Sequence, residues 1–203
     1  SSEVIMQYCN SLTKLDLRSN QISDIGPLRK LTGLKKIYLL NNQINEVSPL
    51  SELTNLNSLI LDHNQISDIS GMANLIGLTY LSLYDNRLTD LSVISNLTNL
   101  TSLSVSGNRL TDLSGISNLI NLTGLSLNDN QIIDLSSISK LTKLENLVLY
   151  SNKITDITPL TNLAKLESLG LEKNQISDIS PLANLTNLDN LRLNNNKISN
   201  ISP

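Results

Sequence analysis

The sequence is poor in aromatic residues and in cysteine. Among its 203 residues there is no Phe and no Trp, and aromatic residues make up 2% of the chain. The core must therefore be built from aliphatic side chains. A single cysteine, Cys9, excludes an internal disulfide bond and a metal cluster held by cysteines. Hydrophobic residues at 39% and charged residues at 16% are typical of a folded globular or repeat protein.

The chain also lacks the features of several function classes. Its net charge of −3 and pI near 5.1 give no basis for nucleic-acid binding, which favours clustered basic surface. No apolar run approaches the roughly 18 residues of a membrane helix, so we expect no membrane insertion. There is no nucleophile–base pair or glycine-rich phosphate loop, and the only histidine, His63, has no second His or Cys to complete a metal site. The sequence predicts a protein without catalysis, cofactor or metal.

What the chain has instead is a strict internal repeat. Aliphatic residues stand eight, five and three positions before a recurring Asn, and two, five, eight and eleven positions after it. This Asn recurs every 22 residues, at positions 20, 42, 64, 86, 108, 130, 152, 174 and 196. Each unit reads LxxLxLxxNxIxxIxxLxxL, the pattern of a leucine-rich repeat. We assign nine repeats to residues 12–203 and a degenerate half-repeat to residues 1–11. Since neither end shows a convincing polar cap, we expect the chain to be a fragment of a longer protein.

The spacing of the apolar residues predicts the shape of one repeat. The LxL segment has a period of two, which is typical of a short strand with inward leucines. All five prolines fall seven positions after their Asn and follow Gly, Ser or Thr, a pattern that predicts a capped helical turn. The few residues left before the next strand allow a 3₁₀ turn but no full α-helix. We therefore predict an α/β repeat solenoid, a right-handed leucine-rich repeat horseshoe with a parallel sheet on the concave face and 3₁₀ turns on the convex face.

Two polar columns recur with the same period. We predict that the Asn side chains satisfy backbone groups where the chain turns into the core, because an amide carries both donors and acceptors. A carboxylate stands four positions after each Asn from Asp24 to Asp178, and Asn200 replaces the last one. Equivalent carboxylates in a line offer neither the differentiated pair of a glycosidase nor the converging oxygens of a calcium site. We interpret them as turn residues that accept hydrogen bonds from backbone N–H groups.

Two segments carry a family resemblance. NQISDISPLANLTNL (Asn174–Leu188) and NKITDITPLTNLAKL (Asn152–Leu166) resemble the 22-residue repeats of the internalins, a family of bacterial surface proteins. The resemblance implies an adhesion or host-interaction module, at the bacterial surface or secreted, that holds a protein partner such as a host cell-surface receptor against its concave sheet. The chain departs from the family in lacking a recognisable helical cap at its start and an immunoglobulin-like segment after the repeats.

Function is expected where the repeats differ, on the outward strand positions. Four of the five tyrosines lie in these columns, and exposed aromatic and aliphatic clusters favour an interface. The predicted partner-binding residues are Arg18, Lys36, Tyr38, Leu40, Ile60, Asp62, Tyr80, Tyr84 and Tyr150. Basic residues gather toward one end of the face and Glu145, Glu167 and Glu172 toward the other, which is an arrangement that orients a partner.

Two other functions remain open at this point. A carbohydrate- or cell-wall-binding module should show aromatic platforms beside amides, and Tyr150 near Asn128 and Asn146 is a weak candidate. An intracellular phosphatase-regulating scaffold also uses 22-residue repeats, but the Ser-Pro turn at Ser180–Pro181 favours the bacterial pattern.

Overall fold

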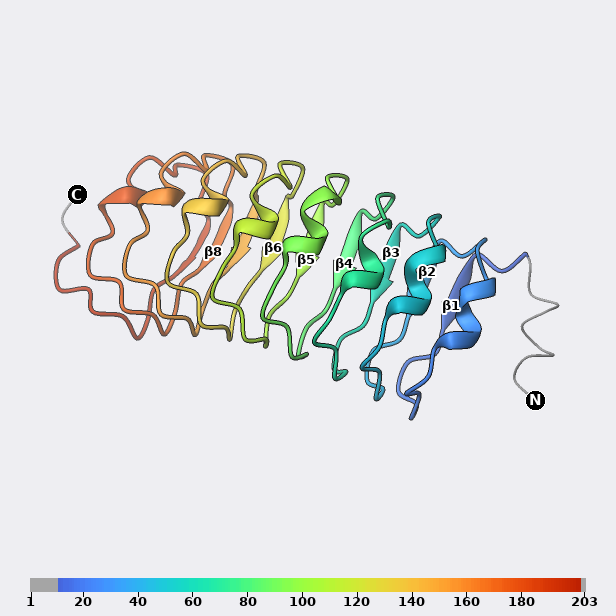
Figure 1. Ribbon diagram of the computed structural model, residues 1–203. Helices are drawn as coiled ribbons and strands as arrows, with labels where there is room; N and C mark the ends of the chain where they lie inside the picture. Colours follow the sequence, from blue (N-terminus) through green and yellow to red (C-terminus); the bar gives the residue numbers. More distant parts are fainter. Residues whose placement is uncertain (1–10, 202–203) are drawn as a thin grey trace.

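The computed structural model describes residues 11–201, in which every repeat forms one coil of a solenoid (Figure 1). Each coil contains a three-residue strand, and each of the first eight coils also has a short 3₁₀ turn on the opposite side. The strands are β1 (Lys14–Asp16), β2 (Lys36–Tyr38), β3 (Ser58–Ile60), β4 (Tyr80–Ser82), β5 (Ser102–Ser104), β6 (Gly124–Ser126), β7 (Asn146–Val148), β8 (Ser168–Gly170) and β9 (Asn190–Arg192). The turns are η1 (Gly26–Lys30), η2 (Ser48–Glu52), η3 (Ser70–Met72), η4 (Ser92–Asn96), η5 (Ser114–Ile116), η6 (Ser136–Ile138), η7 (Thr158–Leu160) and η8 (Ser180–Leu182).

All nine strands form one parallel sheet in sequence order. The register places equivalent residues of neighbouring repeats side by side, so that Tyr38 is the partner of Ile60 and Ile60 is the partner of Ser82. The backbone ladder continues past each strand, as shown by the bond from His63 N–H to the Tyr84 carbonyl at 2.8 Å. The predicted leucine-rich repeat solenoid is confirmed, and the repeat register directly determines which side chains are neighbours on the sheet.

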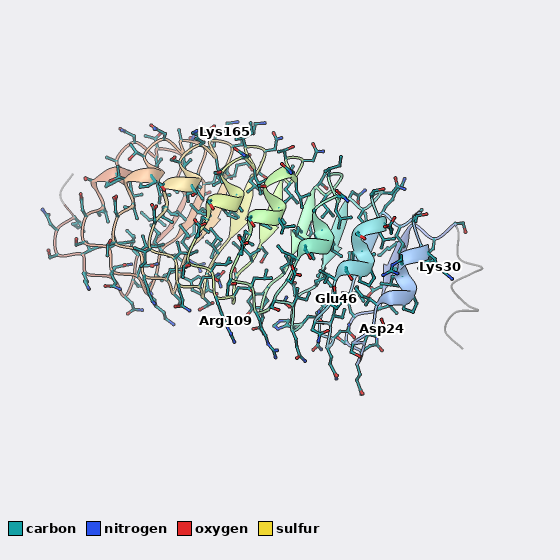
Figure 2. All side chains as sticks on the ribbon, viewed as in Figure 1. Asp24, Lys30, Glu46, Arg109 and Lys165 are labelled. Carbon is teal, nitrogen blue, oxygen red and sulfur yellow. The ribbon has the colours of Figure 1, made fainter. Side chains whose placement is uncertain are left out.

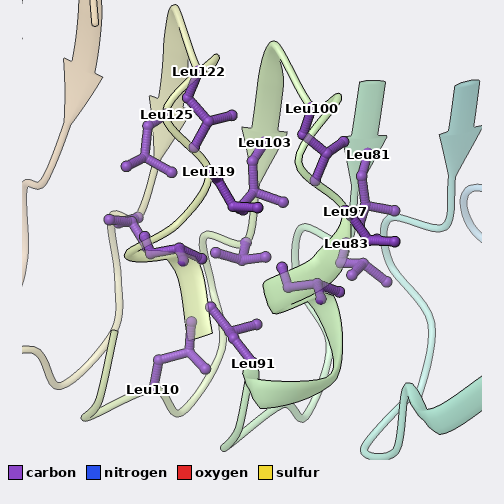
Figure 3. Packing of buried hydrophobic residues seen from close by; sticks show 14 of the residues in the cluster. Leu81, Leu83, Leu91, Leu97, Leu100, Leu103, Leu110, Leu119, Leu122 and Leu125 are labelled. Atoms are coloured by element: carbon purple, nitrogen blue, oxygen red, sulfur yellow. The ribbon is translucent and has the colours of Figure 1, made fainter. Parts of the chain in front are cut away.

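The core is a continuous stack of aliphatic side chains between the sheet and the 3₁₀ turns (Figure 3). Leu81 and Leu83 of one coil, Leu103 of the next and Leu125 of the one after repeat the same inward positions, and all are at most 1% exposed. Burial falls off at the C-terminal end, where Leu191 on β9 is 42% exposed. A repeat buries its leucines against its neighbours, since a single coil is too thin to enclose them.

The recurring Asn side chains join successive coils, as predicted. In one example, Asn86 Nδ2 donates to the carbonyls of Leu61 at 3.0 Å and Leu83 at 3.1 Å, while its Oδ1 accepts from Ile66 N–H at 2.9 Å. One amide therefore satisfies groups of its own coil and of the preceding coil. The residue just before each Asn has a positive φ between 51° and 64°, a left-handed conformation in which non-glycine residues are uncommon.

The start of each 3₁₀ turn differs in detail from the prediction. Ser70, expected as the cap, is the first residue of η3, and the preceding Ile69 makes no side-chain cap bond. The capping group is instead Asp68, whose carboxylate accepts from Ser70 N–H at 2.8 Å and from Ser70 Oγ at 3.0 Å. The prediction erred by one position because Ser70 lies inside the turn, where the Met72 and Ala73 N–H groups already donate to the Ile69 and Ser70 carbonyls.

Glycine replaces proline in two of the turns where coils approach closely. A Cβ on Gly71 or Gly115 would collide with the backbone carbonyl of Val47 or Leu91 in the preceding coil. The predicted half-repeat of residues 1–11, including Cys9, lies almost wholly outside the described residues. Within residues 11–201 there is no helix of the length and apolarity that a membrane crossing requires.

Candidate binding surface

The sheet face consists of the outward side chains of β1 to β9 and of the residue two positions after each strand. All nine residues predicted to bind a partner lie on it. Arg18, Lys36, Tyr80 and Tyr84 are exposed, with Tyr80 at 39% and Tyr84 at 37%, and the other five are half-buried. The half-buried members are Tyr38, Leu40, Ile60, Asp62 and Tyr150. The sheet register brings most of them together on β2 to β4 and leaves Tyr150 apart, beyond β7.

Tyr84 is held firmly by its neighbours. Asp62 accepts from Tyr84 N–H at 2.9 Å and from the buried Ser82 Oγ at 2.5 Å. The His63 ring meets the Tyr84 ring edge-on, with centroids 4.8 Å apart, and its Nδ1 donates to Asp85 Oδ2 at 2.8 Å. We call Asp62, His63, Ser82, Tyr84 and Asp85 the Tyr84 cluster. In this cluster the Tyr84 backbone N–H is held by Asp62 and the exposed ring packs against His63, and such pre-organisation lowers the entropic cost of binding.

The basic end of the face is partly occupied by its own contacts. The Lys14 ammonium and the Arg18 guanidinium lie 5.1 Å and 5.7 Å from the centre of the Tyr38 ring. Arg18 also makes a bidentate salt bridge with Asp16, in which Nε donates to Oδ1 at 2.8 Å and Nη2 donates to Oδ2 at 2.7 Å. This hydrogen bond lowers the pKa of Asp16 and raises the pKa of Arg18. Because Tyr38 already contacts two cations, it is a weaker candidate anchor than Tyr84.

The centre of the face is small and polar. Ser106 Oγ donates to Asn128 Oδ1 at 2.6 Å, and Asn128 Nδ2 donates to Asp129 Oδ2 at 2.8 Å. These side chains satisfy one another, and the strand positions beside them carry only Ser and Gly. The predicted grouping of Asn128 with Tyr150 as a sugar platform gains no hydrogen bond from this arrangement, since both bonds of Asn128 go to other residues.

The acidic end contains a small hollow on the sheet face over β7, β8 and β9. It has a volume of about 130 Å³ and is lined by Val148, Tyr150, Ser168, Leu169, Gly170, Glu172, Asn190 and Arg192. Burial, followed by the nearby Asp129 carboxylate, raises the pKa of Tyr150. The sequence had assigned Glu172 only to a charged rim. The sequence signal for this hollow is Gly170, which has no side chain and so leaves space on the sheet face for the Glu172 carboxylate.

The column of turn carboxylates lies away from the sheet face, and Figure 2 shows Asp24 and Glu46 along one edge of the solenoid. The Ser92 hydroxyl, with the Ser92 backbone N–H, lowers the pKa of Asp90, and Ser114 does the same for Asp112. Each carboxylate is thus used by its own turn. No cluster of three or more His, Cys, Asp or Glu residues suitable for a metal ion occurs in residues 11–201.

Comparisons with known proteins agree with the repeat architecture. A family model described as leucine-rich repeats in two copies matches residues 10–52, 54–96, 76–118, 120–162 and 164–203. No curated protein sequence matches the chain.

The solved structures that are similar to the chain include two internalins and a plant receptor. The internalin InlF of Listeria monocytogenes matches with a TM-score of 0.95 and 40% identity, over 98% of this chain and 59% of that chain. The internalin InlC2 of the same organism matches with a TM-score of 0.84 and 38% identity, over 86% of this chain and 77% of that chain. A plant peptide hormone receptor, RGFR1 in complex with RGF2, matches with a TM-score of 0.77 and 26% identity, over 96% of this chain and 37% of that chain.

Proposed function

Because the chain belongs to the internalin-like leucine-rich repeat proteins, we propose that it binds a protein partner on its sheet face. Proteins with this fold include internalins and plant receptors, and one of the similar plant receptors was solved with its ligand bound. That relation supports a non-catalytic, protein-binding role. The proposal extends to a bacterial surface or secreted location and to a host cell-surface protein as the partner, which the similarity to Listeria internalins favours.

The observation that carries this proposal is the Tyr84 cluster with its surroundings. The exposed Tyr84 ring packs against His63, the Tyr84 backbone N–H donates to Asp62, and Tyr80 stands exposed on the same coil. Tyrosine is enriched at the energetic centres of interfaces because it supplies a large contact area with few rotatable bonds. Ile60 and Leu40, half-buried beside the cluster, add apolar surface around it.

A capture experiment tests the proposal. The immobilised protein is incubated with detergent-solubilised host-cell surface proteins, and the bound proteins are identified by mass spectrometry. We expect Tyr84→Ala to lose the specific partner that the unmodified protein retains. The matched control is Ile133→Ser, which removes an apolar side chain that is 58% exposed and lies outside the sheet face.

Two outcomes contradict the proposal. If Tyr84→Ala and Tyr80→Ala retain every specifically captured protein, the sheet face is not the interface. If Ile133→Ser loses the same partner as Tyr84→Ala, the effect does not depend on the sheet face. A circular dichroism melt of each variant ensures that both changes leave the fold intact.

A further inference from the structure

Glu172 carries an unsatisfied carboxylate on the sheet face. Its Oε2 is the one side-chain nitrogen or oxygen within residues 11–201 that is buried without a hydrogen-bond partner. Its Oε1 lies 3.9 Å from Arg192 Nη1, which is too long for a hydrogen bond. The Glu172 side chain is only 14% exposed, so its charge has been largely removed from water without a donor replacing the water.

The equivalent position one hundred and ten residues earlier shows what a satisfied carboxylate looks like. Asp62 also stands two positions before its Asn, and it accepts bonds from Ser82 Oγ and Tyr84 N–H of the next coil. In the coil after Glu172, the position of Ser82 is taken by Arg192, whose side chain is 64% exposed and points its charge mainly into solvent. The acceptor is therefore retained while its donor has been replaced.

The space beside Glu172 is suited to an incoming group. Its volume of about 130 Å³ is roughly ten times the 10–15 Å³ that one water molecule needs on this measure. Gly170 forms part of the floor, and a Cβ there would stand 3.0 Å from Glu172 Oε2. Val148 and the Tyr150 ring provide apolar wall, while Ser168 and Asn190 provide polar groups.

We propose that this hollow is a subsite for a basic side chain, the ammonium of a lysine or the guanidinium of an arginine, presented by the protein partner. The group that Glu172 lacks is an N–H donor, and a cationic donor also neutralises its charge. The apolar wall matches the methylene stem of either side chain. Arg192 has the exposure and the length to swing aside when the incoming cation takes its place. This proposal rests on the proposed function in one respect only: a protein partner is the molecule that delivers the basic side chain.

The test uses small probes, so it needs no knowledge of the partner. Full-length ¹⁵N-labelled protein is titrated with N-acetyl-arginine methylamide and N-acetyl-lysine methylamide, and backbone amide shifts are followed by NMR. N-acetyl-citrulline methylamide, which is nearly isosteric with arginine but uncharged, is the matched probe control. We expect saturable shifts at Gly170, Glu172 and Arg192 with the cationic probes, and binding weaker by about fivefold or more with citrulline.

Three variants of the subsite and one control variant sharpen the result. Glu172→Gln should weaken the cationic probes by about fivefold or more, whereas Glu52→Gln, an exposed carboxylate on η2, should leave their affinity unchanged. Arg192→Gln should strengthen them by removing the competing cation. Gly170→Ala should weaken them, because its Cβ displaces the Glu172 carboxylate.

The proposal is overturned if citrulline binds as well as arginine, if Glu172→Gln binds the cationic probes unchanged, or if Arg192→Gln weakens them, since that would show that Arg192 helps to hold the probe and does not compete with it. A negative result removes the subsite and leaves the Tyr84 interface untouched. Conversely, failure of the capture experiment leaves the probe result standing.

Discussion

Two carboxylates on the same face of the solenoid, Asp62 and Glu172, occupy equivalent positions and have opposite surroundings. Asp62 is saturated by Ser82 and Tyr84 of the next coil, and it helps to fix an exposed aromatic ring. Glu172 has no short hydrogen bond and borders a hollow. The same backbone therefore provides a rigid, self-satisfied surface in one region and an open acceptor in the other. In a repeat protein, such differences identify the places where side chains serve something other than the fold.

The largest expected effect comes from removing the saturated carboxylate. Asp62→Ala leaves the buried Ser82 hydroxyl and the Tyr84 N–H without an acceptor, so it should lower the free energy of unfolding by about 2 kcal/mol. Glu172→Ala removes no hydrogen bond and also removes a buried acceptor that has no donor, so it should not lower the free energy of unfolding. Urea denaturation followed by circular dichroism measures both values. Equal destabilisation by the two variants would remove the contrast between the two regions.

Two substitutions should give the region around Glu172 the hydrogen bond that Asp62 and Ser82 form. Combining Glu172→Asp with Arg192→Ser places at the acidic end the same two residue types that pair as Asp62 and Ser82. We expect the double variant to be more stable than the starting protein by about 1 kcal/mol, because an unsatisfied acceptor gains a donor. Each single change alone should give less than half of this gain, and additive single effects would show that no new bond has formed.

A smaller effect is expected from the ring pair in the Tyr84 cluster. A double-mutant cycle with His63→Ala and Tyr84→Ala should yield a coupling of about 0.5–1 kcal/mol in thermal or urea unfolding, since edge-on ring contacts contribute on that scale. Pairing His63→Ala with Tyr150→Ala, on a distant coil, is the control and should give no measurable coupling. A zero value for the first pair would mean that His63 does not hold Tyr84.

The smallest expected effects are on stability at low pH, and they should not distinguish the region around Asp62 from the region around Glu172. The turn hydroxyls and N–H groups lower the pKa values of Asp90, Asp112 and Asp156 below that of the unfolded chain. Their contribution to stability is thus complete above the unfolded pKa of about 3.9 and is lost as pH falls through the folded values. Carboxyl ¹³C titration by NMR checks this. Ser92→Ala should move the titration of Asp90 upward and leave Asp156 unchanged, and a shift in both would contradict the local cause.

The sequence predicted the fold well because one register specifies all of it. Each inward leucine, each core Asn and each turn carboxylate follows from its distance to the repeating Asn, and neighbouring coils supply the partners. The error at the start of the 3₁₀ turns arose where two residues close in sequence both have side chains that can cap a turn. Ser70 and Asp68 are both plausible caps by residue type, and only the three-dimensional reach of the carboxylate decides between them.

The sequence predicted where the candidate binding surface lies but not which contacts its side chains make. Columns counted from Asn located all nine candidate residues on the sheet face, and they stay predictions as partner contacts. Lys14 and Arg18 contact the Tyr38 ring, and His63 packs against the Tyr84 ring. Both sets of contacts depend on side-chain torsions that residue spacing does not encode. Glu172 was missed as a site for the same reason, because its importance lies in a donor that is absent from the next coil.

The hydrogen bonds of the Asn side-chain amides, which join adjacent coils, also determine how the protein responds to mechanical load. Asn86 connects its coil to the preceding one, and no bond of this column skips a coil. A pulling force along the solenoid would therefore pass from coil to coil through these bonds. Each coil of 22 residues that opened would extend to about 70–80 Å, so the molecule would lengthen in equal steps.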